Sequence, residues 1–535
     1  MDSPAVLVRT RLSIMMFLEF FVWASWLSPI ATYLSKTCEF TGGQIGWIFS
    51  TTALGAIISP LFVGYVADRL FATERILCVL HLVGGAALLL AAGQTTFAPL
   101  MTLMMVNALA FMPTLALGNS LAFRNIPDPE KFPRIAVLGT IGWIVSGLIV
   151  GIVLSETNNW FFYLAGATEL VLAFYCLTLP HTPPKGREAG GDVLGLGALG
   201  LLRDPAFLVF TLSAFLISIP ALSYFVHCNP FLTETERPAP TALMTLSQVS
   251  EIFVMFTMPW FTARLGLTRV LSLGMAAWAI RYLLFATMQF PLVVVALLLH
   301  GFCYCFVYVG AYIYVDKMAP RDQRASAQSL IAFLMLGVGW FAGSKVAGFT
   351  KDCYPPVIAA MPATEQTEQG QVPVTAAPLP PWRASKSAES PWSVLDLQAT
   401  FRRMISGQQA AAAEPDDLGR LVDTDRDSIL TAEEIKNIPA EGLRLEVGGK
   451  TYLYAKSELE KVFREIDQRA AEARARHLAA AGGAPAEGIG RVEYVAAQAH
   501  DWPPIWWWPA RAAVVVCALF SLGARRKPPD ESAAA

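Results

Sequence analysis

An amide and a carboxyl stand in the middle of an otherwise apolar stretch of the sequence. Gln248 and Glu251 interrupt residues 246–260, whose composition otherwise suits only a lipid-embedded helix. A carboxyl at mid-membrane costs roughly 2.5 to 3.5 kcal/mol on insertion scales, so it normally faces a protected cavity. Because residues three apart on a helix share a face, the two side chains can hydrogen-bond the same polar solute. The alternative is that the pair only ties neighbouring helices together.

The composition of the chain is that of a polytopic membrane protein. Hydrophobic residues make up 54% of the 535 residues, charged residues make up 15%, and the mean hydropathy is +0.47. The sequence has no basic cluster with interleaved aromatics that would indicate nucleic-acid binding. It also has no nucleophile motif, phosphate loop or catalytic metal cluster, so we do not expect an enzyme.

Windows of about 20 apolar residues predict about twelve spanning helices. Their limits are 12–34, 44–66, 75–93, 97–121, 136–156, 160–179, 205–228, 241–262, 268–288, 290–315, 325–349 and 504–523. Positive residues gather in alternate loops, for example Arg124, Lys131 and Arg134, whereas the opposite short loops hold little beyond Lys36 and Arg237. By the positive-inside rule, both termini are predicted to be cytoplasmic.

A polar, Pro- and Gly-rich segment divides the predicted spans into six and six. The predicted parts are an N-terminal six-helix half (1–179), a cytoplasmic linker (180–203), a C-terminal half with helices 7 to 11 (204–350), an extracytoplasmic insertion (351–500), and helix 12 with a cytoplasmic tail (501–535). Two six-helix halves around a central site indicate alternating access rather than a static pore.

The insertion between helices 11 and 12 is long and polar. Its first part, residues 355–391, has the composition of a disordered linker, and residues 456–477 predict a solvated helix.

One motif in the insertion is typical of calcium binding. Residues 423–434 match an EF-hand loop with oxygen ligands at positions 1, 3, 5, 7 and 12. The predicted ligands are Asp423, Asp425, Asp427, the backbone carbonyl of Ile429 and both carboxylate oxygens of Glu434. The sixth position, normally Gly, is Ser428, which must adopt a left-handed conformation. EF-hands usually pair, and the flanks of a degenerate second loop lie between residues 467 and 494; a solvated acidic turn is the alternative.

Several further motifs follow one another in order along the spanning region. They are FLEFFVWASW at 17–26, GYVADR at 64–69, FMPTLALGNS at 111–120, LGTIGW at 138–143, TLPHTP at 178–183, SQVSE at 247–251, YVDK at 314–317 and RASAQ at 324–328. Through them the chain resembles the nucleoside:proton symporters of the major facilitator superfamily, of the enterobacterial nucleoside permease type. The resemblance implies an all-α fold of twelve helices that carries a nucleoside together with a proton and needs no cofactor.

The resemblance also implies a substrate site between the two halves. Gln248 and Glu251 would hydrogen-bond the nucleoside, Thr140 would assist, and Trp143 and Tyr304 would supply aromatic walls. Ordinary packing is the alternative for Trp143.

The proton route must use ionisable residues within the spans. The candidates are Glu19, Glu251, Arg281, His300 and Lys345. We predict that Glu251 acts with His300, which is therefore included in the site, although a hydrogen-bonded core histidine is the alternative.

The chain departs from the family at several polar positions. Ala136 stands where the family has Arg, and Cys305 replaces the Asp of an aromatic-Asp pair. The polar pair of the seventh span falls on Leu222 and Phe225. The resemblance therefore leaves the substrate and the proton coupling open.

We expect a secondary transporter of the cytoplasmic membrane, a monomer in the lipid bilayer, that carries a nucleoside with protons. One alternative substrate is another polar metabolite, such as a sugar or a modified nucleoside. The other alternative is a membrane sensor that does not transport and whose outer domain binds Ca²⁺.

Overall fold

The structure, a computed structural model, describes most of the spanning helices and part of the insertion. The described residues are 3–69, 71–126, 128, 132–184, 196–321, 323–356, 358, 360–367, 369–379, 429–447, 450–481 and 488–523. They form two compact units. The spanning unit comprises residues 1–230, 239–353 and 503–535, and the second unit comprises residues 231–238 and 354–502.

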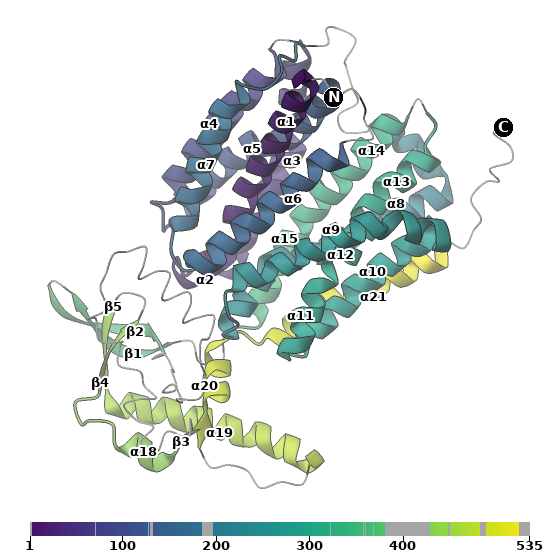
Figure 1. Cartoon of the computed structure of the whole chain (residues 1–535). Coiled ribbons are helices and arrows are strands. Elements are labelled where there is room, and N and C mark those ends of the chain that lie inside the picture. The colour runs from purple at the N-terminus through teal and green to yellow at the C-terminus, as the bar shows by residue number, and fades with distance from the viewer. Residues whose placement is uncertain are drawn as a thin grey trace. The chain divides into compact units, whose positions relative to one another are not determined.

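The first half of the spanning unit is drawn in purple and blue in Figure 1. Its helices are α1 (Ser3–Leu27) with α2 (Ile30–Lys36), α3 (Gly42–Arg69), α4 (Thr73–Ala91), α5 (Phe97–Asn125), α6 (Pro133–Leu148) continued by the π-helical segment η2 (Ile149–Val153), and α7 (Trp160–Cys176). Within this half α1 packs on α6 and α7, and α4 packs on α5 and α7.

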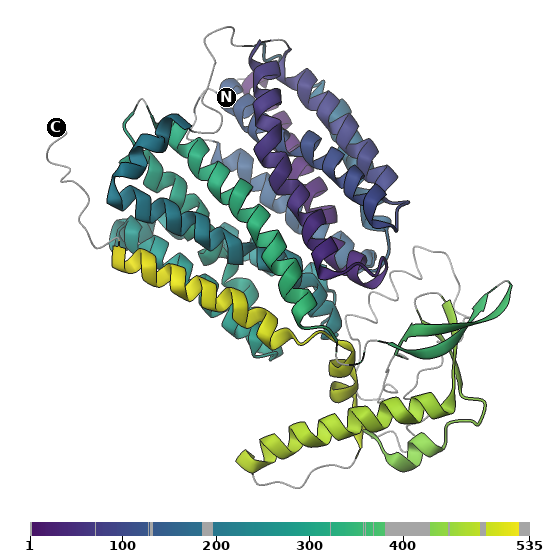
Figure 2. The ribbon, with the colours of Figure 1, turned by 180° about the vertical axis from the view of Figure 1, so that it is seen from behind.

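The second half, in teal and green with a yellow last helix, lies beside the first (Figures 1 and 2). Its helices are α8 (Pro205–Glu234), α9 (Pro240–Leu265), α10 (Leu267–Ala286), α11 (Phe290–Leu298), α12 (His300–Tyr304) with the π-helical segment η4 (Cys305–Val309) and α13 (Gly310–Met318), α14 (Arg324–Ala332) with the π-helical segment η5 (Phe333–Gly339) and α15 (Trp340–Cys353), and α21 (Trp502–Gly523). A 3-10 segment, η3 (Leu196–Arg203), precedes α8.

Ten of the twelve predicted spans are confirmed, because ten helices in the described residues are long and apolar enough to cross a membrane. The other two predicted spans are also helical. Of these, α7 has 17 residues, and α3 extends over 28 residues, of which only those before residue 60 have described side chains.

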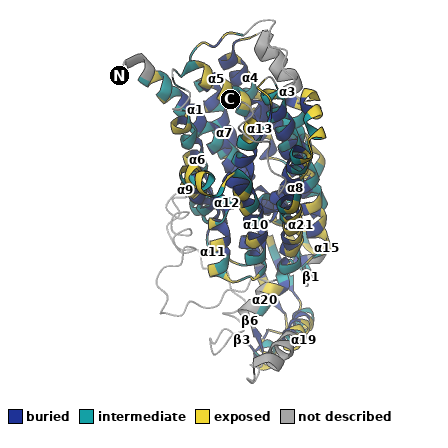
Figure 3. Cartoon of the chain, turned by 90° about the vertical axis from the view of Figure 1, so that its right-hand side faces the viewer, coloured by how far each residue is buried: buried dark blue, intermediate teal, exposed yellow. Residues whose placement is uncertain are grey.

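The helices of the spanning unit place apolar side chains outward and bury polar ones. On α9, Phe253, Phe256 and Trp260 are 66%, 74% and 55% exposed, whereas Ser247 and Gln248 on the same helix are 0% and 7% exposed. Figure 3 shows this distribution, with exposed residues along the outer faces of the helices. A helix with this inverted polarity belongs in lipid, with its polar face turned to protein.

The two halves pack closely at one end of the spanning unit. Gly46 of α3 has no room for a side chain, because a Cβ there would meet the carbonyl oxygen of Ser344 on α15. The carboxylate of Asp352 accepts the backbone N–H groups of Gly42 at 2.6 Å and Gly43 at 2.7 Å, and so caps the first turn of α3. The halves are thus held together at this end by backbone contacts and by charge.

The second unit contains strands that the all-α prediction did not include. A four-stranded antiparallel sheet has the order β2 (Gly370–Pro378), β1 (Ala360–Thr367), β5 (Lys450–Tyr454), β4 (Leu443–Val447). The linker prediction is therefore wrong over residues 360–378, while residues 380–391 lie outside the described part. Composition did not indicate these strands: β1 pairs with its neighbour β2 on one side and with β5, far along the chain, on the other.

Helices of the second unit pack beside a small two-stranded pair. The helices are α18 (Ala432–Lys436), α19 (Lys456–Ala481) and α20 (Arg491–Gln498), and the pair joins β3 (Ile429–Leu430) to β6 (Ile489–Gly490). The helix predicted over 456–477 is confirmed as α19, but it is not fully solvated. It buries a stripe formed by Leu459, Val462, Phe463 and Ile466, which are spaced for one helix face.

Candidate functional site

A cavity of about 260 Å³ lies between the two halves of the spanning unit. Trp143 and Gly147 of α6 line it from the first half, together with Ser28 from the turn between α1 and α2. The second half contributes residues of α8 and α9, namely Tyr224, Phe225, Thr241, Met244, Thr245 and Gln248. The walls thus combine aromatic rings with hydroxyl and amide groups, a combination that suits a planar ligand bearing polar groups.

Gln248 presents an unmatched acceptor at this cavity. Its side chain is 7% exposed, and its buried Oε1 atom has no hydrogen-bond partner among the residues that the structure describes. A buried polar atom that stays unpaired costs about 1 to 3 kcal/mol, so a ligand that donates to it gains that stabilisation. Glu251 does not line the cavity, but lies less than one helical turn further along α9 and is 14% exposed.

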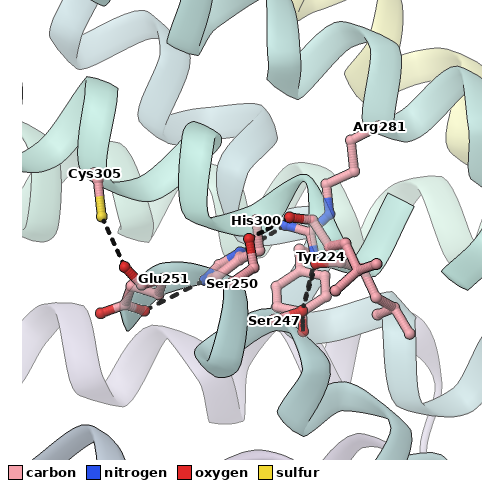
Figure 4. A network of polar contacts seen from close by, with 9 residues as sticks. Tyr224, Ser247, Ser250, Glu251, Arg281, His300 and Cys305 are labelled. Carbon is pink, nitrogen blue, oxygen red and sulfur yellow. Dashed lines mark hydrogen bonds and ion pairs between the residues drawn. The ribbon is translucent and has the colours of Figure 1, made fainter. Parts of the chain in front are cut away.

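Glu251 faces a buried histidine and arginine on neighbouring helices (Figure 4). Glu251 Oε2 lies 4.0 Å from His300 Nε2, and Arg281 Nη1 lies 2.7 Å from His300 Nδ1. Arg281 and His300 are 0% and 2% exposed. The sequence is locally suited to this approach, because Gly301 has no side chain where the carbonyl oxygen of Ser250 passes.

The geometry sets the protonation of His300. The guanidinium of Arg281 can only donate, so His300 Nδ1 must accept, and the ring hydrogen sits on Nε2, on the side of Glu251. The 4.0 Å separation is longer than a hydrogen bond. His300 therefore stays neutral while Arg281 donates to it, and the group in this network that can gain or lose a proton is Glu251.

Arg281 is held by two further side chains. Its guanidinium carbon lies 3.7 Å from the centre of the Tyr224 ring, and its Nη2 lies 3.5 Å from Ser247 Oγ. The Tyr224 hydroxyl and Ser247 Oγ are 2.9 Å apart, and Ser247 donates to the Leu297 carbonyl at 3.1 Å. Because Tyr224 also lines the cavity, it connects the ligand space to the buried charge.

Of the remaining predicted site residues, Trp143 lines the cavity, whereas Tyr304 and Thr140 do not. Tyr304 stacks on His300 with ring centres 5.9 Å apart, so Glu251, His300 and Tyr304 form one group. Thr140 is half-buried on α6, three residues before Trp143. Trp143 itself lines the cavity and meets the Trp23 ring edge-on at 5.6 Å.

The positions that depart from the family fall into three environments. Phe225 lines the cavity, 5.6 Å from the Trp340 ring, and Leu222 is buried beside it in the core. The Cys305 thiol lies 3.6 Å from the backbone carbonyl of Glu251. Ala136 lies in the first turn of α6, seven residues from Trp143 and thus roughly 10 Å along the helix.

Sequence reasoning missed the roles of Arg281, Tyr224 and Ser247. Arg281 was recognisable as an intramembrane charge, but nothing in the local sequence paired it with His300. Ser247 immediately precedes Gln248, so the polar cluster Ser247, Gln248, Ser250 and Glu251 was the available signal.

The calcium motif is only partly within the described residues. Asp423, Asp425, Asp427 and Ser428 lie outside them, and of Ile429 only the backbone, in β3, is described. Glu434 is buried, and its Oε2 accepts the N–H and the hydroxyl of Thr431 at 3.0 Å each, which caps α18. Within the described ranges, no three His, Cys, Asp or Glu side chains gather to hold a metal ion.

Comparisons with known proteins agree on one family. The family model described as nucleoside H⁺ symporter matches residues 6–356. The chain is 44% identical over 355 residues to the putative nucleoside transporter YegT of Escherichia coli (strain K12), an alignment that covers 63% of this chain and 83% of YegT. It is 33% identical over 370 residues to the xanthosine permease of the same organism, covering 65% and 88% of the two chains. The crystal structure of the nucleoside transporter NupG matches with a TM-score of 0.60 and 28% identity, over 65% of this chain and 91% of that one. This chain therefore belongs to the nucleoside H⁺ symporter family, with the spanning helices in a major facilitator fold.

Proposed function

We propose that this chain carries a nucleoside, together with a proton, through the cavity between its two halves by alternating access. The observation that carries the proposal is the unmatched Oε1 of Gln248 in that cavity, beside Trp143. Relatives are named for nucleosides and for xanthosine, which supports the same class of substrate here.

The lining residues match the two parts of a nucleoside. Trp143 and Phe225 come from opposite halves and offer aromatic faces to a planar base. The hydroxyls of Ser28, Thr241 and Thr245 can donate to and accept from ribose hydroxyls. The Oε1 atom of Gln248 would accept a hydrogen bond from a donor group of the base.

Binding of a nucleoside requires the halves to move. Both halves contribute residues to the wall of the cavity, so a nucleoside can enter only when the halves separate. Because the halves approach closely at Gly46 and Asp352, we infer that they separate at the opposite end of the helices when a nucleoside enters. With the predicted orientation, that end faces the cytoplasm.

Glu251 would carry the coupling proton of the cavity. Arg281 fixes His300 as a neutral donor, so a proton that enters this network binds Glu251. Protonation would cancel the negative charge that Arg281 balances, and this change of charge would link the proton to movement of α9 against α10 and α12.

The cellular setting follows from the family and the loops. We infer a bacterial inner-membrane protein that acts as a monomer, with both termini in the cytoplasm and the insertion outside. The division into halves at 1–179 and 204–350, with a linker at 180–203, belongs to this proposal.

Transport in proteoliposomes tests the function. With an inward proton gradient, the wild-type protein is expected to accumulate labelled nucleoside, and Gln248→Ala is expected to lose roughly tenfold or more of that uptake. Gln94→Ala is the matched control, since Gln94 follows α4 and its side chain donates to the Leu90 carbonyl, away from the cavity. Competition by unlabelled nucleosides and sugars identifies the substrate class. No uptake by the wild type at any proton gradient would contradict the proposal and favour a sensor that does not transport.

A second candidate function, calcium binding by the insertion, is favoured by the pairing of β3 with β6. This pair joins Ile429 and Leu430 of the EF-hand-like loop to Ile489 and Gly490, where the degenerate partner loop was predicted. Paired EF-hands have such a bridge between their loops. The family match ends at residue 356 and gives this proposal no support.

Terbium luminescence of the whole protein in detergent tests calcium binding, because terbium occupies calcium sites. Calcium is expected to displace terbium with weak, roughly 0.1 to 1 mM affinity, as in extracellular modules. Glu434→Ala should abolish the signal, and Glu433→Ala, the neighbouring acid, should not. Equal signals from both variants would reject the loop as the site.

A further inference from the structure

A second group of buried ionisable side chains lies in the N-terminal half. Glu19 of α1, His81 of α4 and Glu169 of α7 are each 1% exposed or less. His81 Nδ1 lies 3.4 Å from Glu169 Oε1, and Asn107 of α5 donates to Glu169 Oε2 at 3.3 Å. Glu19 hydrogen-bonds Thr114 of α5 and interacts electrostatically with Glu169. Four helices thus meet at two carboxyls and one imidazole.

The cluster has no permanent positive charge. In the described part of the chain, no Arg or Lys forms an ion pair with Glu19 or Glu169, and His81 is the basic partner of Glu169. The other titratable groups that face it are the thiols of Cys78 on α4 and Cys176 on α7. None of these residues lines the cavity between the halves.

The number of protons bound to this cluster determines its net charge. Two carboxyls and a neutral imidazole carry a charge of −2 when no proton is bound, and two bound protons make the cluster neutral. The two protons sit either on both carboxyls, or on one carboxyl and the imidazole. Burial of net charge in an apolar surrounding is strongly disfavoured, so the sealed cluster holds two protons and releases one only when water reaches it.

The backbone leaves space for the carboxyls. A Cβ on Gly84 would meet Glu169 Oε1, and a Cβ on Gly118 would lie 3.0 Å from Glu19 Oε2. Two buried acceptors in the cluster have no partner, Glu19 Oε1 and Asn107 Oδ1. Asn107 turns its amide group to Glu169, so its free oxygen stands at the cluster and can accept from a protonated group there.

We propose that Glu19, His81 and Glu169 form a proton-binding site in the N-terminal half, separate from the nucleoside cavity, whose occupancy changes during transport. The part that concerns transport rests on the proposed function. A proton fits better than a metal ion, because one member is an imidazole and the described residues contain no metal-holding group of acids and histidines. Movement of α1 against α4 and α7 would open the site to water.

The test compares two modes of transport in proteoliposomes containing the full-length protein. Glu169→Gln keeps the shape of the side chain but removes the acid. It is expected to lose roughly tenfold or more of nucleoside accumulation driven by a proton gradient, while exchange of labelled for unlabelled nucleoside without a gradient changes less than about twofold. Glu19→Gln should behave in the same way. Glu74→Gln is the control, since Glu74 is a buried carboxyl of the same half that bonds His181 and Thr182.

Infrared spectroscopy of the protein in nanodiscs measures the protonation of the carboxyls independently of transport. The wild type is expected to show protonated-carboxyl bands at neutral pH that decrease on alkalinisation and are reduced in Glu169→Gln and Glu19→Gln but not in Glu74→Gln. The proposal is overturned if the wild type has no such band, if both variants keep it, or if both keep wild-type proton-driven accumulation. A response to sodium in place of protons would also overturn it. Failure of nucleoside transport by the wild type, with the infrared result intact, would reject the proposed function and leave the proton site standing.

Discussion

The two halves of the spanning unit bury their charges in different ways. In the C-terminal half, the cation Arg281 lies against His300, and Glu251, 4.0 Å from the other ring nitrogen, is its balancing charge in the proposed function. In the N-terminal half, Glu19 and Glu169 share only His81 as a basic partner. The first network is neutral with no proton bound to Glu251, and the second is neutral only when two protons are bound.

The two networks also differ in their relation to the substrate cavity. The C-terminal network touches the cavity through Tyr224, whose ring centre lies 3.7 Å from the guanidinium carbon of Arg281. None of the residues of the N-terminal cluster lines the cavity, and in the proposal above the charge of this cluster changes with bound protons. In the proposals above, the C-terminal network binds the substrate and a proton at Glu251, and the remote N-terminal cluster binds protons in addition.

The largest expected effect comes from removal of the permanent cation. Arg281→Gln leaves Glu251 without its balancing charge and frees His300 Nδ1, so the free energy of unfolding should fall by about 3 to 5 kcal/mol. Thermal unfolding in detergent measures this loss. Arg264→Gln is the control, because Arg264 is exposed at the end of α9.

A double variant sharpens the same comparison. Arg281→Gln combined with Glu251→Gln removes both charges, and about half or more of the lost stability should return, since the pair is coupled. If the double variant is no more stable than Arg281→Gln alone, the two charges do not balance each other as described.

The next effect is expected when the C-terminal network is made to resemble the N-terminal one. Cys305→Asp adds a second acid beside Glu251, and an ionised carboxyl in this position costs about 2.5 to 3.5 kcal/mol. The variant should take up a proton at acidic pH and bind nucleoside normally there, while its binding weakens as pH rises. Binding measured across pH, with Cys305→Asn as the neutral control, checks this. Equal pH profiles for the two variants would count against the assigned charge balance.

A smaller effect is expected from crowding the N-terminal cluster. Gly84→Ala places a methyl group against Glu169 Oε1 and should lower stability by about 1 to 3 kcal/mol while weakening proton-driven accumulation. Gly93→Ala is the matched control near the same helix, because its new methyl would meet only the Leu90 carbonyl, at 3.7 Å. If Gly84→Ala matches Gly93→Ala in both measurements, the carboxyl does not occupy the position described.

The sequence alone was sufficient to predict most of the spanning helices and to identify Gln248 as a candidate site residue. Long apolar windows depend on bilayer thickness alone, so ten spans could be predicted without any tertiary information. Gln248 could be recognised as a site residue because a polar side chain within a spanning helix is costly. In the structure it lines the cavity.

The contacts between residues on different helices could not be predicted from the sequence. Arg281 and His300 lie 19 residues apart, and His81 and Glu169 lie 88 apart, so their pairing depends on how the helices pack. His81 and Glu169 stand inside the predicted spans 75–93 and 160–179 but were not among the proposed proton carriers. A search for every ionisable residue in each span finds both. The strand β1 was missed in part for a similar reason, since its second partner β5 comes after a long interval.

The smallest expected effect concerns the support of Arg281 rather than its charge. Ser247→Ala removes the hydroxyl that Tyr224 and Arg281 share, so the unfolding free energy should fall by only about 1 kcal/mol. Nucleoside affinity should nevertheless decrease, because the Tyr224 hydroxyl loses the partner that orients it at the cavity. Ser272→Ala, which removes a hydroxyl of α10 outside this network, is the control. Stability and affinity measured together decide the case: a loss of stability with unchanged affinity would show that Ser247 holds the helices together without positioning Tyr224 for the ligand.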